Sequence, residues 1–143
     1  MENIGQLFSQ ISKKLVFDIN KKLKEFDLTI SQLKVIVVLK EANKNICQKD
    51  LSERLNIKSS SLIDSLKILE RKDLIRRTPS LENAKYTMVE LTDKGRSILS
   101  VTNLGKDHTE EMICRTLGFR NTEEMILKFQ EVLTNLETHQ YYE

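Results

Sequence analysis

The feature that most constrains the fold of this chain is an alternation of apolar and polar residues that occurs in one place only. Two stretches, Leu74–Thr78 and Lys85–Leu91, alternate as short strands do, and Pro79–Ala84 between them has the residues of a turn. Elsewhere the apolar residues recur at helical spacing. We therefore predict a mainly α-helical chain that carries one small β-hairpin.

The composition agrees with a helical chain and excludes several other classes of protein. One proline and four glycines in 143 residues are too few turn residues for a sheet-rich fold, and the length suits a single core. The longest apolar run, Val35–Leu39, is too short to cross a bilayer, and the first ten residues do not resemble a signal peptide. We therefore expect a cytoplasmic protein with no membrane partner.

No group of residues in the sequence has the spacing of a catalytic or metal site. Cys47 and Cys114 are far apart, and His108 and His139 stand alone, so we expect no metal and no cofactor. The sequence also lacks a glycine-rich phosphate loop and a nucleophile elbow. We therefore do not expect an enzyme.

Helical spacing and capping patterns divide the rest of the chain into helices. Thr29 with Gln32, and Asn121 with Glu124, have the spacing of capping boxes, in which side chains bond the free amides at a helix start. The predicted helices cover about Ile4–Phe26, Ile30–Glu41, Gln48–Leu55, Ser59–Lys72, Asp93–Leu117 and Glu123–His139.

The order of these elements is that of a winged helix-turn-helix between long terminal helices. A short helix, a turn, a second helix and the hairpin follow one another between Asn45 and Thr92. The terminal helices carry more apolar surface than a lone domain needs, so we expect a homodimer that covers it. The apolar residues that we assign to the dimer interface are Ile4, Leu7, Phe8, Ile11, Ile126, Phe129, Leu133 and Leu136.

Several segments of the sequence, taken in order, resemble the multiple-antibiotic-resistance regulator (MarR) family. They are Gln48–Ile57, Ser59–Leu62, Leu69–Arg77, Pro79 in the wing and Leu91–Gly95. The resemblance implies a dimeric transcription regulator with a recognition helix in the major groove and a wing at the minor groove, often released from DNA by a small molecule or an oxidant. It also implies one MarR-like domain over residues 1–143. Within it, 29–92 would be the winged helix-turn-helix DNA-binding part, and 1–28 and 93–143 the helical dimerisation part.

The resemblance points to polar and basic residues of the recognition helix and the wing as DNA contacts. Ser59, Ser60 and Ser61 open the recognition helix, where small hydroxyls either approach the groove closely or simply cap the helix. The candidate cations for phosphate are Lys58, Arg76, Arg77 and Lys85, although basic residues on a hairpin are also common as solvated surface. A symmetric dimer would read a pseudo-palindromic operator in double-stranded DNA, with half-sites about 10 base pairs apart.

The wing departs from the family pattern. The family usually carries Asp-x-Arg there, whereas this chain has Asn83, Ala84 and Lys85 after Pro79. Lys85 keeps a cation for the minor groove but lacks the planar guanidinium that suits a narrow groove. Asn83 keeps a hydrogen-bonding group without the charge that would brace an arginine. We therefore expect weaker or less selective wing contacts.

The recognition helix also departs from the pattern, because Asp64 stands where many relatives carry a basic or neutral residue. If Leu62, Leu66 and Leu69 form the buried stripe, then Asp64 faces outward together with Ser60 and Lys67. An outward carboxylate repels phosphate but can accept a hydrogen bond from a cytosine amino group. The alternative is a local ion pair with Lys67, three residues along the helix.

Cys47 lies just before the helix that begins at Gln48, where thiols ionise more readily, so it is a candidate redox sensor. The alternative is a small, half-buried residue without a role. For the whole chain the leading hypothesis is a dimeric, sequence-specific DNA-binding transcription regulator, a repressor released by a small-molecule effector or an oxidant. The alternative is a winged-helix protein-interaction module with weak or no DNA binding, which the net charge of only +2 allows.

Overall fold

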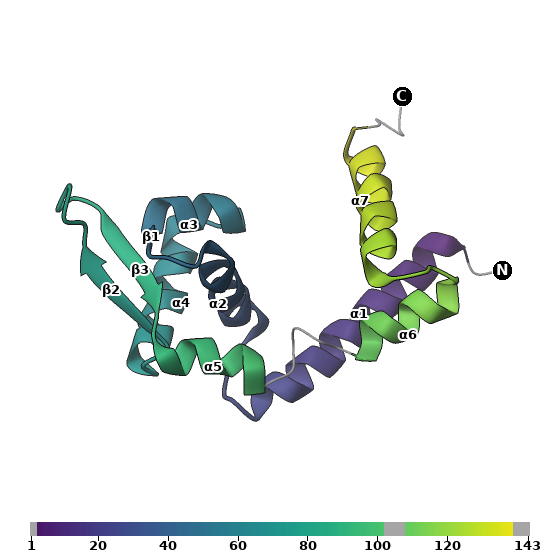
Figure 1. Ribbon diagram of the computed structural model, residues 1–143, viewed down its shortest axis with the longest axis horizontal. Coiled ribbons are helices and arrows are strands. Elements are labelled where there is room, and N and C mark those ends of the chain that lie inside the picture. Colours follow the sequence, from purple (N-terminus) through teal and green to yellow (C-terminus); the bar gives the residue numbers. More distant parts are fainter. Residues whose placement is uncertain (1–2, 102–107, 139–143) are drawn as a thin grey trace. The chain divides into compact units, whose positions relative to one another are not determined.

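The computed structural model describes residues 3–101 and 108–138, which fall into two units that divide between residues 104 and 105. Figure 1 labels their helices and strands. The elements of the first unit are α1 (Ile4–Lys24), α2 (Ile30–Ala42), β1 (Ile46–Cys47), α3 (Gln48–Leu55), α4 (Ser59–Arg71), β2 (Ile75–Pro79), β3 (Thr87–Leu91) and α5 (Asp93–Val101). The second unit holds α6 (His108–Leu117) and α7 (Thr122–Thr138).

Three of the helices, α1, α2 and α7, begin where side chains bond the free amides of the first turn. The predicted capping box of Thr29 and Gln32 is confirmed at the start of α2, and a similar box of Asn3 and Gln6, which we did not predict, starts α1. At the start of α7 the Asn121 side chain accepts from the Glu124 amide at 2.8 Å. Local capping thus fixes three of the helix starts.

The predicted helix over Asp93–Leu117 is found as α5 and α6, and residues 102–107 between them lie outside the described residues. We had assigned α5 to the dimerisation part of the chain. In the structure it packs against α2 and β3 of the first unit.

The wing belongs to a three-stranded antiparallel sheet in the order β1-β3-β2, not to a simple hairpin. Cys47 of β1 pairs with Met88, and Ile75 of β2 pairs with Leu91. The sequence pattern predicts no element between the helices Ile30–Glu41 and Gln48–Leu55, and it misses β1 there because a strand of two residues is too short for an alternating pattern. The β2–β3 hairpin extends from the body of the first unit (Figure 1).

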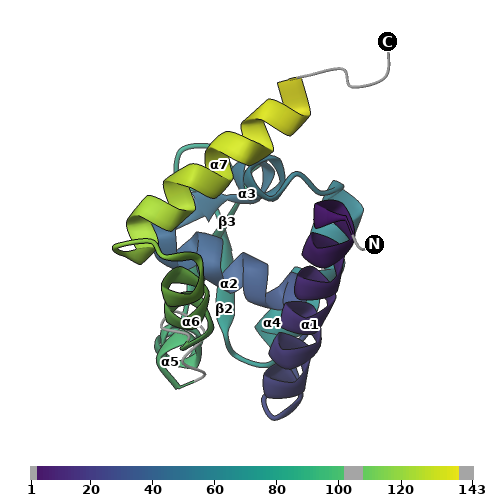
Figure 2. The same cartoon turned by 90° about the vertical axis from the view of Figure 1, so that its right-hand side faces the viewer.

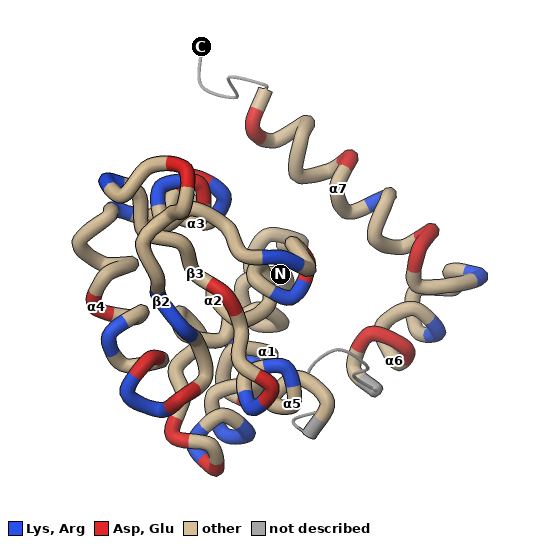
Figure 3. Tube along the Cα trace, turned by 60° about the vertical axis from the view of Figure 1, so that its left-hand side comes forward, with Lys and Arg blue, Asp and Glu red and all other residues tan. Residues whose placement is uncertain are grey.

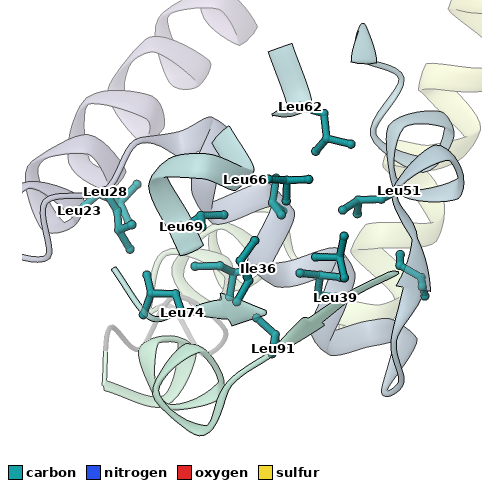
Figure 4. Close-up of a cluster of buried hydrophobic side chains, with 14 residues drawn as sticks. Leu23, Leu28, Ile36, Leu39, Leu51, Leu62, Leu66, Leu69, Leu74 and Leu91 are labelled. Atoms are coloured by element: carbon teal, nitrogen blue, oxygen red, sulfur yellow. The ribbon is translucent and has the colours of Figure 1, made fainter. Parts of the chain in front are cut away.

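The core of the first unit surrounds α2, which contacts α1, α3, α4, α5 and β3 (Figure 2). Figure 4 shows Ile36 of α2 facing leucines of the neighbouring elements. Leu62, Leu66 and Leu69 of α4 are fully buried there, which confirms the predicted inward stripe of the recognition helix. This packing fixes which face of α4 is left outward.

In the second unit α6 packs against α7. Met125 and Cys114 are buried, and the rings of Phe119 and Phe129 meet edge to face with centroids 6.3 Å apart. These residues make the small core that α6 and α7 share.

Most of the apolar residues that we expected to be buried along α7 are exposed in the single chain. Ile126 is 44% exposed, and Leu133 and Leu136 are each 56% exposed, while Phe129 is half-buried. Met125, near the start of α7, is the one residue of this helix that is buried in the described part of the chain. The apolar residues assigned to the interface on α1 are exposed as well: Ile4, Leu7, Phe8 and Ile11.

Among the described residues, no helix combines the length and the apolar character that crossing a membrane requires.

Candidate nucleic-acid interface

The α3 and α4 helices form a tight helix-turn-helix. Asn56 ends α3 in the left-handed conformation, with φ of 50°, which reverses the chain direction in few residues. The Ile57 amide donates to the Ser52 carbonyl at 3.2 Å, and the Ser52 hydroxyl donates to the Ile57 carbonyl at 2.9 Å. Both bonds hold the start of α4 in a fixed place beside α3.

The three serines lie exposed in the first turn of α4. One expectation about them is wrong, since none caps the helix: the N-cap is Lys58, whose carbonyl accepts from the Leu62 amide at 3.1 Å. The helix therefore starts one residue too early for Ser59 to act as its cap. The hydroxyls of Ser59, Ser60 and Ser61 have no hydrogen-bond partner among the described residues.

The outward face of α4 carries Ser60, Asp64 and Lys67, all of them exposed. The local ion pair between Asp64 and Lys67 is not formed, and the Asp64 carboxylate has no hydrogen-bond or ion-pair partner within residues 3–101 and 108–138. The i,i+3 spacing allows such a pair but does not enforce it at an exposed site. The face thus offers hydroxyls, one cation and one unpaired carboxylate.

Arg77 of β2 forms a bidentate ion pair with Glu70 of α4. Its Nε and Nη2 donate to the two carboxylate oxygens at 3.2 and 2.9 Å, and its side chain is only 22% exposed. The hydrogen bond from Arg77 holds the pKa of the Glu70 carboxyl below its usual value, against a smaller opposing effect of burial. Sequence reasoning assigned Arg77 to phosphate, whereas the structure turns its guanidinium towards the protein.

The other basic residues of the wing region remain on the surface. Arg76 lies across from Glu90 on the neighbouring strand, with 3.4 Å between Nη1 and Oε1, and its side chain is 65% exposed. Lys58 and Lys85 are exposed and have no ion pair among the residues that the structure describes. The basic positions of β2 appear in blue in Figure 3.

The tip of the wing is an ordered turn. The Ser80 amide donates to the Tyr86 carbonyl at 2.8 Å, and the Tyr86 amide donates to the Asn83 carbonyl at 3.0 Å. The side-chain oxygen of Asn83 accepts from the Lys85 amide at 3.1 Å. Where the family pattern has an acid, Asn83 thus shapes the turn. Pro79 is exposed at the end of β2.

Two residues next to this surface were missed by sequence reasoning. Gln48 and Lys49, at the start of α3, line a pocket together with Ser59 and Lys85. The available signal was their position at the first turn of the first helix of the helix-turn-helix, which commonly lies against the DNA backbone.

Cys47 is half-buried and is the N-cap of α3, without a capping bond from its side chain. No group of three metal-binding side chains occurs among the described residues. The candidate site is the exposed surface that α4 and the wing form together.

Comparisons with known proteins agree with this fold. The family described as a winged helix DNA-binding domain matches residues 28–95. The HTH-type transcriptional regulator SarZ of Staphylococcus aureus is 35% identical over 94 residues, which are 66% of this chain and 63% of the relative. The chain therefore matches less than two thirds of the length of these relatives.

Two solved structures have the same fold over nearly the whole chain. The S. aureus MepR–DNA complex is 24% identical with a TM-score of 0.75, and the similarity covers 94% of this chain and 96% of that one. Wild-type MarR of E. coli, in its apo form, is 22% identical with a TM-score of 0.68, covering 95% and 97%. Fold and site define a winged helix-turn-helix protein. The chain has the fold of MarR and MepR, which agrees with the fold that the sequence resemblance implied.

Proposed function

We propose that this chain is a dimeric, sequence-specific DNA-binding transcription regulator that represses its target and is released by a small molecule or an oxidant. The observation that carries the proposal is the outward face of α4, whose serines and Lys67 are free of partners among the described residues, beside an ordered wing. Small polar side chains on such a helix suit base edges, and neighbouring cations suit phosphates.

The similar proteins support this proposal. The relative SarZ is named a transcriptional regulator, and MepR has been solved with DNA. We assign Ser59, Ser60, Ser61, Asp64 and Lys67 to the bases of the major groove and the phosphates beside it. Lys58, Arg76 and the wing residues Pro79, Asn83 and Lys85 are assigned to the backbone and the minor groove. Residues 29–92 would form the DNA-binding part, in a protein that acts in the cytoplasm without catalysis.

A fluorescence-polarisation titration tests the proposal with the duplex upstream of the gene and a random duplex of equal length. We expect tighter binding to the upstream duplex and a steep loss of affinity as salt rises, because bound cations release counterions from phosphates. Equal binding to both duplexes at low salt would contradict sequence-specific recognition.

A second candidate function is a protein-interaction module. The unpaired carboxylate of Asp64 repels phosphate, and Arg77, which could have bound DNA, is held by Glu70. Such a module would give no DNA isotherm at any salt concentration, so the same titration separates the two functions.

A further inference from the structure

A small pocket lies where the start of α3, the start of α4 and the turn of the wing meet. It has a volume of about 180 Å³. The polar residues that line it include Gln48 and Lys49 of α3, Ser59 of α4, and Lys85 and Tyr86 just before β3. Three elements that are separate in the sequence therefore contribute polar side chains to one hollow.

The charge of this pocket is entirely positive. Lys49 and Lys85 are both exposed, and neither ammonium group has a hydrogen-bond or ion-pair partner in the described parts of the chain. No carboxylate lines the pocket. A second, larger hollow of about 550 Å³ shares Lys49 but includes Asp50 and Glu82. Of the two, only the smaller pocket has lysines and no carboxylate that would compete with a bound anion for them.

We propose that this pocket binds one backbone phosphate of the DNA, with Lys49 and Lys85 as its two cations and Gln48 and Ser59 as neutral hydrogen-bond donors. The inference rests on the proposed DNA-binding function and adds α3 to the contact surface. A phosphate held there contacts the first helix, the recognition helix and the wing together. It therefore fixes the register of the protein on the duplex without reading sequence.

The position of the pocket favours a DNA phosphate over a free anion. Ser59 lines it, and the next residues, Ser60 and Ser61, lie exposed on the first turn of the helix that would enter the groove. The pocket thus continues the surface that is assigned to DNA. It also supplies the cations that Arg77 does not, because that guanidinium is paired with Glu70.

Salt-dependent titrations of Lys49→Gln, Lys85→Gln and the double variant provide the first test. We expect each single variant to weaken binding about equally on the upstream and the random duplex, since phosphate carries no sequence information. In a dimer with two pockets, the double variant should lower the slope of log K against log salt by about 2. Its loss should be smaller than the product of the single losses, because both lysines act on one phosphate. The matched control is Lys34→Gln, an exposed lysine of α2 outside the pocket, which should leave the slope unchanged.

Replacing single phosphates of the duplex by neutral methylphosphonates provides the second test. We expect one position in each half-site where the replacement weakens binding by the wild-type protein but not by the double variant. Finding no such position, or the same positions for both proteins, would overturn the pocket assignment while DNA binding itself stands. If the wild-type protein fails to bind any duplex, the proposed function is at fault instead.

Discussion

The Asp64 carboxylate is exposed on α4. Among the described residues no cation pairs with it, Lys67 included. A carboxylate in the major groove can accept a hydrogen bond from the amino group of cytosine but is repelled by the acceptors of guanine and thymine. Asp64 should therefore determine the preferred base at one position of each half-site.

Asp64→Asn should shift that preference from cytosine to adenine, because an asparagine amide bonds both adenine N7 and N6. We expect a change of about tenfold in relative affinity, since one base contact is worth roughly 1–3 kcal/mol. Selection from a randomised duplex library measures it. Glu41→Gln, which removes an exposed carboxylate of α2, should leave the selected sequence unchanged. An unchanged preference in Asp64→Asn would remove Asp64 from the reading surface.

Gly95 at the start of α5 determines how closely that helix approaches Leu74, which lies just before β2. A Cβ at this position would overlap the carbonyl oxygen of Leu74 and would lie 3.1 Å from a methyl carbon of Leu91. The Gly95 amide also donates to the Thr92 hydroxyl at 3.0 Å, so the backbone cannot easily move away.

Gly95→Ala should therefore destabilise the fold by about 1–3 kcal/mol, the usual range for forcing an extra carbon into a packed site. Urea unfolding followed by circular dichroism measures this change. The matched control is Gly5→Ala in α1, where a Cβ meets only the Asn3 side chain at 3.4 Å, so stability should not fall. Equal stability of Gly95→Ala and the wild type would contradict the close approach.

At the scale of elements, the wing is attached to the recognition helix by the ion pair between Glu70 and Arg77. Because hydrogen bonding from Arg77 lowers the folded-state pKa of Glu70, folding favours the ionised carboxylate. The stabilisation is therefore complete at neutral pH. It is lost as the pH falls through the lowered pKa, below the usual glutamate value.

Glu70→Gln should cost about 0.5–1 kcal/mol at neutral pH, since the pair is partly exposed to solvent. The difference from the wild type should shrink as urea titrations are repeated down to about pH 3. Glu53→Gln, at an exposed glutamate of α3, is the control and should show no such convergence. A difference that stays constant over the whole pH range would mean that the carboxylate charge is not what stabilises the contact.

The elements that the sequence predicted well are those set by local patterns. The Thr29 cap and the buried leucines of α4 depend on neighbours within one or two turns, and both were found. The strand at Ile46 was missed, because it exists only through pairing with Val89, far along the chain. The pair of Asp64 with Lys67 was anticipated from spacing alone, whereas Arg77 found Glu70 on another element. Contacts between elements therefore decide which candidate site residues remain free for a ligand.

At the scale of the whole molecule, the apolar faces of the terminal helices require an explanation. On α1, Ile4 is 73% exposed, and on α7 Leu133 and Leu136 are each 56% exposed. At 100° per residue, Ile126, Leu133 and Leu136 fall on one side of α7. Contiguous apolar surface of this kind is usually covered by a second copy of the chain. We therefore expect a dimer of twice 16.7 kDa.

Leu133→Glu should shift the protein towards the monomer in sedimentation-velocity experiments, because it places a charge in the expected interface. DNA affinity should fall with it by about two orders of magnitude or more, since two linked recognition helices bind far more tightly than one. The control is Leu127→Glu, at an equally exposed leucine on the opposite side of α7, which should leave the dimer intact. If both variants dissociate, a charge anywhere on α7 disrupts the dimer, and its apolar face is not specifically responsible. If neither variant dissociates, the face of α7 is not where the two copies meet, and two recognition helices would have to be held on adjacent turns of the operator by other surfaces.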